Sequence, residues 1–445
     1  MNELQSETLG RYQRSRARSR ELFDLLTDEA YYSQPIALRH PIVFYEGHLP
    51  GFSFNTLIKK ALGQPSIDAR LEGLFARGID PHESSAGQAS TASPESRWPS
   101  RTTVRAFATD ADRRIEDALL NGALDRRGHP LLDRAEAAFC IIEHEALHHE
   151  TLLYMWHRLP FAVKRRPANY RPRTEGTSPR VEWINVPAGR ATLGVDRDAV
   201  RFGWDNEFPA RAEDVAAFVI ERHDVTNGRF LEFVEAGGYR DARWWTPEDW
   251  QWVQQEGVSH PLFWEREGDA WCWRGMFESL PLPLSWPVYV SQAEASAFTR
   301  WSGTRLPTEA EFQRAAYGSP GGERQYPWGS DEPSPERGVF DFSSWDPWPA
   351  GSHPAGASAW GVEDLVGNGW EWTSTPFGPF PGFRTMASYP EYSADFFDNQ
   401  HVVMKGASPA TARELLRPTF RNWFRTRYPY VYANFRCAKN DAGRP

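Results

Sequence analysis

Apolar residues recur at the spacing of an α-helix through much of the first third of the chain. The run over residues 130–159 shows this period most clearly, and Pro130 stands at the expected start of the helix. Residues 4–28 and 103–121 repeat the pattern, and a further helix is expected around residues 54–62. Several antiparallel helices of this kind predict an N-terminal four-helix bundle.

The pattern changes after a basic, Pro-rich segment at residues 164–180. From there on, short runs typical of strands, such as WINVPAG, FVIERHDV and HVVMKGAS, alternate with turns and a few helices. S/T-x-x-E capping boxes at Ser291 and Thr308 predict where two of those helices begin. We therefore expect a helical domain over residues 1–165 and a compact α+β domain over residues 181–445.

Composition indicates that much of the backbone is irregular. The 445 residues include 20 Trp, 35 Pro and 34 Gly. Large aromatic rings can order loops because they bury much apolar area with few rotatable bonds. The Ser/Ala/Pro-rich residues 83–100 predict a mobile loop within the helical domain.

Charge and cysteine content exclude several classes of protein. The net charge of −9 disfavours wholesale nucleic-acid binding, which needs a concentrated basic face. No apolar run approaches the ~20 residues that span a bilayer, and the polar N-terminus has no signal-peptide core. Cys140, Cys272 and Cys437 lie too far apart in sequence for a disulfide scaffold or a CxxC metal knot. These features predict a cytoplasmic protein that binds neither nucleic acid nor membranes.

Two histidines in the strongest helix form a candidate metal site. His144 and His148 stand at positions i and i+4, so both imidazoles leave one face of the helix and can reach one ion. Apolar residues flank them on that face, which points the pair into the bundle. His48, among apolar residues upstream, is a candidate third donor, and three imidazoles suit zinc or iron. The alternative is that these are hydrogen-bonded core histidines.

The same residues match H-E-x-x-H, the helix of zinc proteases, with Glu145 in the place of the general base. Such proteases need a third ligand downstream, often in the extended pattern H-E-x-x-H-x-x-G-x-x-H. Here the chain continues HETLLYMWHRLP, with neither that Gly nor a well-placed His. A zinc metalloprotease is therefore a distant alternative.

Several spaced motifs, in the same order, resemble one enzyme family. A distant His followed by H-x-x-x-H resembles the DinB-like domain of the ergothioneine sulfoxide synthases (EgtB type). The segments TRLPTEAEFQRAA, GVEDLVGNGWEWTST, HVVMKGAS and FRNW with ANFRC resemble their formylglycine-generating-enzyme-like domain, a C-type-lectin-like fold. The resemblance covers most of the chain.

This resemblance implies a mononuclear nonheme Fe(II) enzyme that uses O2 to join a chalcogen atom to the imidazole of hercynine, Nα-trimethylhistidine. By position, His48, His144 and His148 match the family's iron ligands. Asn422 and Trp423 match residues that help hold the trimethylammonium group. An indole face suits that role, because quaternary ammonium ions bind aromatic faces, although Trp423 is alternatively a core ring.

Two other classes share the C-terminal domain. True formylglycine-generating enzymes act through cysteines in this fold, but only Cys272 and Cys437 occur in this half of the chain, and Cys272 lies in a WCW segment far from FRNW. Those enzymes also lack the helical His motif. A non-catalytic lectin-like module leaves the three histidines unexplained.

Three segments depart from the family pattern. In the γ-glutamylcysteine-using enzymes an Asp and an Arg that bind the donor follow the Asn-Trp pair, whereas Phe424 and Tyr428 stand here. The cysteine-using subgroup has a Tyr pair for oxygen activation where this chain has Leu57 and Ile58. Gln residues often lie between the two helix histidines, but residues 146–147 are Ala and Leu.

The combination resembles the selenoneine synthase branch (SenA), which implies a selenosugar as chalcogen donor. Aromatic faces with a few polar groups commonly hold sugars. Five aromatic residues are expected to form a rim of this kind around the sugar. Alternatively they pack in the core. They are Trp423, Phe424, Tyr428, Tyr430 and Tyr432. Arg425 and Arg427 are expected to add hydrogen bonds, and Tyr428 and Tyr430 are candidates for catalytic proton transfer. The alternative is an ergothioneine sulfoxide synthase that forms a C–S bond with a thiol donor.

Overall fold

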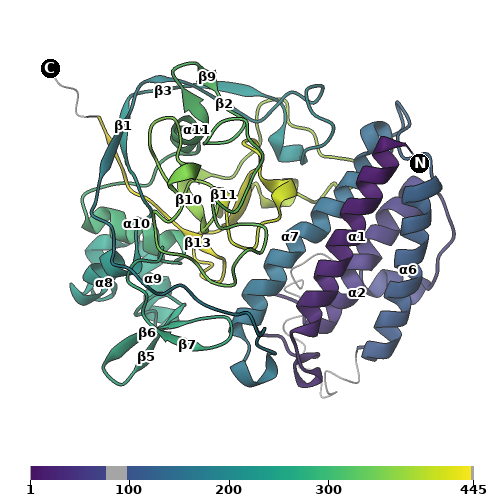
Figure 1. Ribbon diagram of the computed structural model, residues 1–445, viewed down its shortest axis with the longest axis horizontal. Coiled ribbons are helices and arrows are strands. Elements are labelled where there is room, and N and C mark those ends of the chain that lie inside the picture. Colours follow the sequence, from purple (N-terminus) through teal and green to yellow (C-terminus); the bar gives the residue numbers. More distant parts are fainter. Residues whose placement is uncertain (1, 77–97, 442–445) are drawn as a thin grey trace. The chain divides into compact units, whose positions relative to one another are not determined.

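The computed structural model describes residues 2–76 and 98–441 (Figure 1). The chain forms two compact units, one of Met1–Asn169 with Ala387–Tyr389, the other of Tyr170–Met386 with Pro390–Pro445. The predicted order, a helical bundle followed by an α+β domain, is confirmed. Most of the loop predicted over residues 83–100 lies outside the described residues.

Helices that lie side by side form the first unit (Figure 1). The long ones among the described residues are α1 (Glu3–Asp24), α2 (Ile42–Ser53) with its continuation η2 (Phe54–Ala61), α6 (Arg101–Asn121) and α7 (Glu136–Arg158). The short ones are η1 (Asp28–Ala30), α3 (Ala69–Leu74), η3 (Asp133–Ala135) and η4 (Phe161–Val163). On α6 the buried side chains follow the expected helical period, and they include Val104, Phe107, Ala111, Ile115 and Leu119. On α1, polar residues share the buried stripe, among them Arg16 and Ser19.

Three helix boundaries differ from the sequence prediction. The helix expected over residues 4–28 ends at Asp24. The helix expected around residues 54–62 is the end of a longer one that begins at Ile42 and passes through Pro50. Proline cannot donate an amide hydrogen bond, and the helix continues after it as the π-helix η2. The helix expected from Pro130 begins at Glu136, because Arg134 and Ala135 take left-handed backbone angles, with φ of 59° and 60°.

Short strands and irregular segments form the second unit. Its central sheet has the strand order β12-β11-β10-β13, in which β10 to β12 are antiparallel neighbours and β13 is parallel to β10. A second sheet has the order β1-β4-β14. The strands are β1 (Trp183–Val186), β2 (Gly189–Leu193), β3 (Arg211–Val215), β4 (Phe218–Glu221), β5 (Trp264–Glu267), β6 (Ala270–Arg274), β7 (Ser279–Pro281), β8 (Gly318–Ser319), β9 (Gly322–Glu323), β10 (Gly369–Pro376), β11 (His401–Ala407), β12 (Asn422–Arg425), β13 (Ala433–Asn434) and β14 (Ala438–Asn440).

Two helices of this unit begin where the sequence predicts. Ser291 and Thr308 each form the expected capping box, with Glu294 and Glu311. The longer helices are α8 (Asn227–Glu235), α9 (Pro247–Glu256), α10 (Gln292–Trp301) and α11 (Glu309–Tyr317).

Buried rings and one buried cation order the irregular backbone of the second unit. The rings with the least exposure include Trp264, Trp273, Trp286, Trp370 and Trp372. The fully buried Arg436 donates to Glu371 and Asp224, and to the backbone carbonyls of Glu221, Arg222 and Glu363. Across residues 2–76 and 98–441, none of the helices has the length and apolar character that crossing a bilayer requires.

Candidate metal centre

Three imidazoles meet in the interior of the helical unit. His48 comes from α2, and His144 and His148 come from α7. Their donor nitrogens all lie within 4.8 Å of one another, and the two Nε2 atoms of His144 and His148 are 3.2 Å apart. Each histidine is at most 5% exposed. Among the described residues, no other group of His, Cys, Asp and Glu has this geometry.

The neighbourhood of His48 fixes which of its nitrogens is free. Its Nδ1 lies 2.7 Å from the backbone carbonyl of Phe75, so Nδ1 carries the proton and donates it, which leaves Nε2 as the lone-pair donor. The absence of a side chain at Gly47 brings Phe75 this close. A Cβ built there would lie 2.4 Å from the Phe75 ring.

Aromatic rings hold the imidazoles in place. Phe52 lies face to face with His144, with centroids 3.5 Å apart and planes inclined by 12°. Phe44 stacks in the same way on His48, at 4.8 Å and 19°. Since a stacked ring blocks rotation about the side-chain bonds, these contacts orient the donor nitrogens before any ion arrives.

Tyr389 also borders the cluster. It belongs to the three-residue segment Ala387–Tyr389 that joins the first unit, and its ring lies edge-on to His144 with centroids 5.9 Å apart. It contacts Phe52 as well, at 5.1 Å. The sequence reasoning missed this residue, because nothing in the local pattern of an irregular segment marks it.

Burial keeps the three imidazoles neutral. It lowers the pKa of His48 to about 4, and it lowers the pKa values of His144 and His148 well below the usual range. Nδ1 of His144 and Nδ1 of His148 are buried without a hydrogen-bond partner among the described residues. Three converging neutral imidazoles in a buried site, two of them with an Nδ1 that has no partner among the described residues, fit a divalent transition-metal ion.

Glu145, the middle residue of the H-E-x-x-H pattern, is used differently from a protease base. Its Oε1 accepts a hydrogen bond from Nη1 of Arg16 at 2.7 Å and another from the hydroxyl of Ser19. This fully buried carboxylate is therefore committed to α1, and the geometry disfavours the protease alternative.

The residues predicted to bind substrate lie in the second unit, on and after strand β12. Asn422 accepts the backbone N–H of Trp423 at 2.9 Å. Trp423 is half-buried and stacks on Phe377 at 4.2 Å with planes inclined by 4°. Tyr392 and Phe396 lie beside the same indole at 5.1 and 5.8 Å. Trp423 is thus part of an aromatic cluster that is not fully buried.

The remaining predicted residues separate into three environments. Phe424 stacks on Tyr428 with ring centroids 5.2 Å apart, and Tyr430 meets Tyr428 edge-on at 4.9 Å. Arg427 donates to Asp249 at 2.8 Å. Arg425 is exposed at the end of β12.

Two members of the expected rim are buried in the second unit, as the core-packing alternative predicted. Tyr428 is 4% exposed, and Tyr432 is 3% exposed and stacks on Tyr289 at 5.6 Å. Tyr432 immediately precedes strand β13, which pairs with the central strand β10, and this position draws the Tyr432 side chain inward.

Two family models match the chain. The DinB superfamily matches residues 11–152, and the sulfatase-modifying factor enzyme 1-like domain matches residues 170–441. The predicted fold class, a DinB-like bundle followed by a formylglycine-generating-enzyme-like domain, is confirmed.

Relatives of known name agree with these matches. A hercynine oxygenase of Mycolicibacterium smegmatis is 38% identical over 311 residues, which cover 67% of this chain and 70% of that protein. The hercynine oxygenase of Mycobacterium tuberculosis is 41% identical over 249 residues, covering 55% and 58%. Ergothioneine biosynthesis protein 1 of Schizosaccharomyces pombe is 28% identical over 459 residues, covering 94% and 54%. The chain thus spans little more than half the length of the last two.

These similarities establish the family. The chain belongs to the hercynine oxygenase (EgtB-like) family, and it combines a DinB domain with a sulfatase-modifying-factor-like domain. The prediction that it is an enzyme of this type is confirmed.

Proposed function

We propose that the chain is an O2-dependent nonheme Fe(II) enzyme that forms a carbon–selenium bond between hercynine and a selenosugar. The observation that carries the proposal is the convergence of His48, His144 and His148 in a chain whose relatives are hercynine oxygenases. Three neutral imidazoles leave coordination positions open for substrates, as oxygen-using iron sites require.

The overall reaction balances without a further reductant. Selenol, hercynine and O2 give a hercynyl selenoxide and water. The new C–Se bond replaces one C–H and one Se–H bond, and both hydrogens leave with one oxygen atom as water. The second oxygen atom oxidises selenium. Bound Fe(II) would supply O2 activation and a lower selenol pKa.

The residues around the three histidines would orient and shield this chemistry. His48, His144 and His148 would hold the ion, with Phe44 and Phe52 fixing their rings and keeping water away. Two phenols border the cluster and could hold or deliver a proton: Tyr389, whose ring lies 5.9 Å from that of His144, and Tyr45, whose ring lies 5.7 Å from that of His148. Tyr428 and Tyr430, predicted from residue type alone, stay candidates for this role.

The aromatic cluster around Trp423 supports hercynine as substrate. A trimethylammonium group cannot donate classical hydrogen bonds and is recognised by ring faces. Trp423 with Tyr392 and Phe396 offers such rings in a half-buried setting, and Asn422 adds an amide beside them.

The residues that depart from the family pattern have surroundings that support a sugar, rather than a peptide thiol, as the chalcogen donor. Leu57 and Ile58 are fully buried in η2, where they serve packing and provide no phenol. Phe424 and Tyr428 stack on each other, where thiol-using members are expected to carry an Asp and an Arg. Phe424, the half-buried ring of this pair, suits a sugar face, and neither ring offers a charge to a donor carboxylate.

A competition assay tests the proposal. Fe(II)-loaded protein is incubated with hercynine, O2 and equal amounts of selenosugar, cysteine and γ-glutamylcysteine, and the product is identified by mass spectrometry. We expect a hercynine adduct with the isotope pattern of selenium, and no adduct with the His48→Ala variant. A sulfur adduct would instead place the chain with the ergothioneine sulfoxide synthases.

A further inference from the structure

The helix that carries two of the histidines has a second buried polar strip. Successive residues of an α-helix are rotated by about 100°, so Glu145 and His149 leave α7 roughly 100° away from His144 and His148. All four side chains are buried. Helix α2 contacts α7 and brings His48 to the first strip, and helix α1 brings polar partners to the second.

Hydrogen bonds connect the second strip to two other helices. From α1, Nη1 of Arg16 donates to Glu145 at 2.7 Å. Ser19 contacts both strip residues, Glu145 and Nε2 of His149, the latter at 2.8 Å. The Nε atom of the same Arg16 donates to Asp112 of α6 at 2.8 Å. One guanidinium, 5% exposed, thus bridges α1, α6 and α7.

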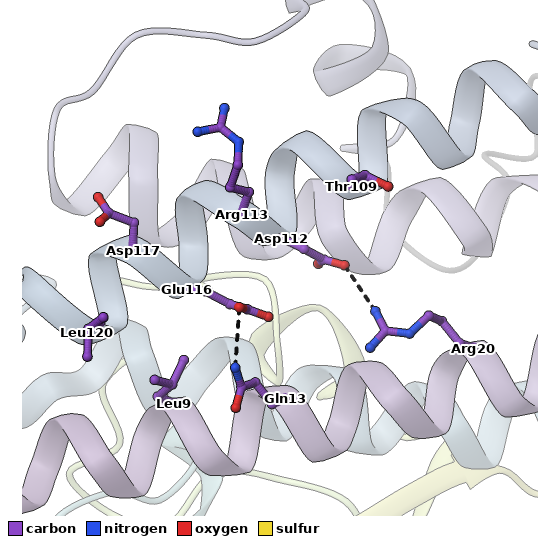
Figure 2. Close-up of a pocket in the computed structure, with 9 residues that line it drawn as sticks. All are labelled: Leu9, Gln13, Arg20, Thr109, Asp112, Arg113, Glu116, Asp117 and Leu120. Atoms are coloured by element: carbon purple, nitrogen blue, oxygen red, sulfur yellow. Dashed lines mark hydrogen bonds and ion pairs between the residues drawn. The ribbon is translucent and has the colours of Figure 1, made fainter.

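The outer end of this network lies at a surface groove. Asp112 also accepts the Tyr12 hydroxyl at 2.7 Å, and its second oxygen lies 3.6 Å from Arg20. Figure 2 shows Asp112 facing Arg20 across the groove between α1 and α6, with Gln13 and Glu116 paired beside them. The network therefore runs from the groove to the residue that follows His144 in sequence.

We infer that Arg16 is a positioning residue for the metal centre: it fixes the rotation of α7 about its axis so that His144 and His148 face His48. The inference rests on the proposed metal centre and extends it to residues that touch no ligand. A planar guanidinium makes hydrogen bonds in fixed directions, so its bonds to Glu145 and Asp112 define an angle between helices, which apolar contacts do not.

Stability alone is a weak reason for this arrangement. Replacing a buried ion pair with uncharged groups of similar size is often neutral or stabilising, whereas removing one partner leaves a buried charge uncompensated. An intact buried ion pair instead holds the helices that it joins in one relative orientation. A rotation of α7 by a few tens of degrees would separate donor nitrogens that now lie within 4.8 Å.

Co(II) titration of the full chain tests whether Arg16 positions the metal centre or only compensates the charge of Glu145. Co(II) substitutes for Fe(II), and its visible absorption reports both the affinity and the symmetry of the ligands. The variants are Arg16→Met, Glu145→Gln, the double variant Arg16→Met/Glu145→Gln and Arg16→Lys. Arg229→Met, which breaks a pair with Glu221 at 2.8 Å in the other unit, is the matched control. Urea unfolding of each metal-free protein gives its stability.

We expect Arg16→Met to lose stability and to bind Co(II) at least ten times more weakly. The double variant should recover the stability lost to the uncompensated Glu145 carboxylate, but neither the affinity nor the wild-type spectrum. Arg16→Lys should recover part of both the stability and the affinity. Arg229→Met should bind Co(II) like the wild type. If Arg16→Met does not fold, the Co(II) affinity and spectrum of the double variant test whether Arg16 positions the metal centre.

Wild-type Co(II) affinity and spectrum in the folded double variant would overturn the inference, because charge compensation would then explain the network. A wild-type chain that binds no Co(II) through histidine would instead contradict the proposed metal centre itself. The two failures are therefore distinguishable.

Discussion

His48 donates its Nδ1–H to the backbone carbonyl of Phe75 at 2.7 Å, and this bond leaves Nε2 of His48 directed at His144 and His148. The bond depends on the close approach of Phe75 to α2 at Gly47, where a side chain would collide with the ring at 2.4 Å.

Gly47→Ala should therefore weaken metal binding. The added methyl group must displace the Phe75 ring, which moves the carbonyl that orients His48. We expect a loss of about 1–3 kcal/mol in stability from overpacking and a clearly weaker Co(II) affinity. Gly73→Ala is the matched control, because a Cβ there meets nothing within 4 Å. Equal Co(II) affinity in both variants would show that the Phe75 bond does not set the His48 geometry.

Tyr389→Phe should reduce turnover while leaving metal binding intact. The change removes only the hydroxyl, so the ring contacts with His144 and Phe52 remain. General acid–base catalysis contributes about 10²–10⁴-fold, and we expect kcat to fall by about that factor. Tyr428→Phe and Tyr430→Phe serve as the comparison. If Tyr428→Phe or Tyr430→Phe loses more turnover than Tyr389→Phe, the tyrosine predicted from the sequence, and not Tyr389, transfers the proton.

The metal-free protein should lose stability as the pH falls. Burial holds the folded-state pKa of His48 at about 4, below the ordinary value of 6.5. Between these two pH values the unfolded chain therefore binds more protons than the folded chain. The stabilising contribution is complete above about pH 6.5 and is lost as the pH falls toward 4, on the order of 3 kcal/mol for His48 alone. His144 and His148 shift in the same direction.

Urea unfolding at pH 7.5, 6 and 5 measures this effect. The midpoint should fall with pH in the metal-free wild type and fall less in His48→Phe, which has one buried imidazole fewer. A midpoint that does not change over this range would contradict the burial of neutral imidazoles.

Trp423→Ala should raise the Michaelis constant for hercynine far more than that for the chalcogen donor. The indole is expected to contact the trimethylammonium group, and cation–π contacts contribute about 0.5–2 kcal/mol. Trp360→Ala, which removes a half-buried indole elsewhere in the second unit, is the control. Equal effects on both substrates would assign Trp423 to packing.

Periodicity and local caps predicted much of the fold. The helical spacing of α6 and α7 and the capping boxes at Ser291 and Thr308 are local features, and local features can be read from a short stretch of sequence. The i, i+4 spacing also predicted that His144 and His148 share a face. His48 was a candidate third donor from its residue type and apolar surroundings, and its match to an iron ligand followed from the family resemblance, because no local pattern joins residues so far apart.

The remainder depends on long-range packing. Tyr389 reaches His144 from an irregular segment far along the chain, and no period marks that position. Tyr428, Tyr430 and Tyr432 have the same residue type, yet Tyr428 and Tyr432 are buried and Tyr430 is half-buried. From the sequence alone, Glu145 fits a protease motif. Its hydrogen bond with Arg16 becomes visible only when the two helices are packed together.

The most direct test of the central claim is the iron content of the protein after anaerobic loading with Fe(II) and removal of excess metal. Wild type should retain about one iron per chain, and folded His48→Ala, His144→Ala and His148→Ala should each retain little. Unchanged iron in folded His48→Ala would contradict the three-histidine centre on which the account depends.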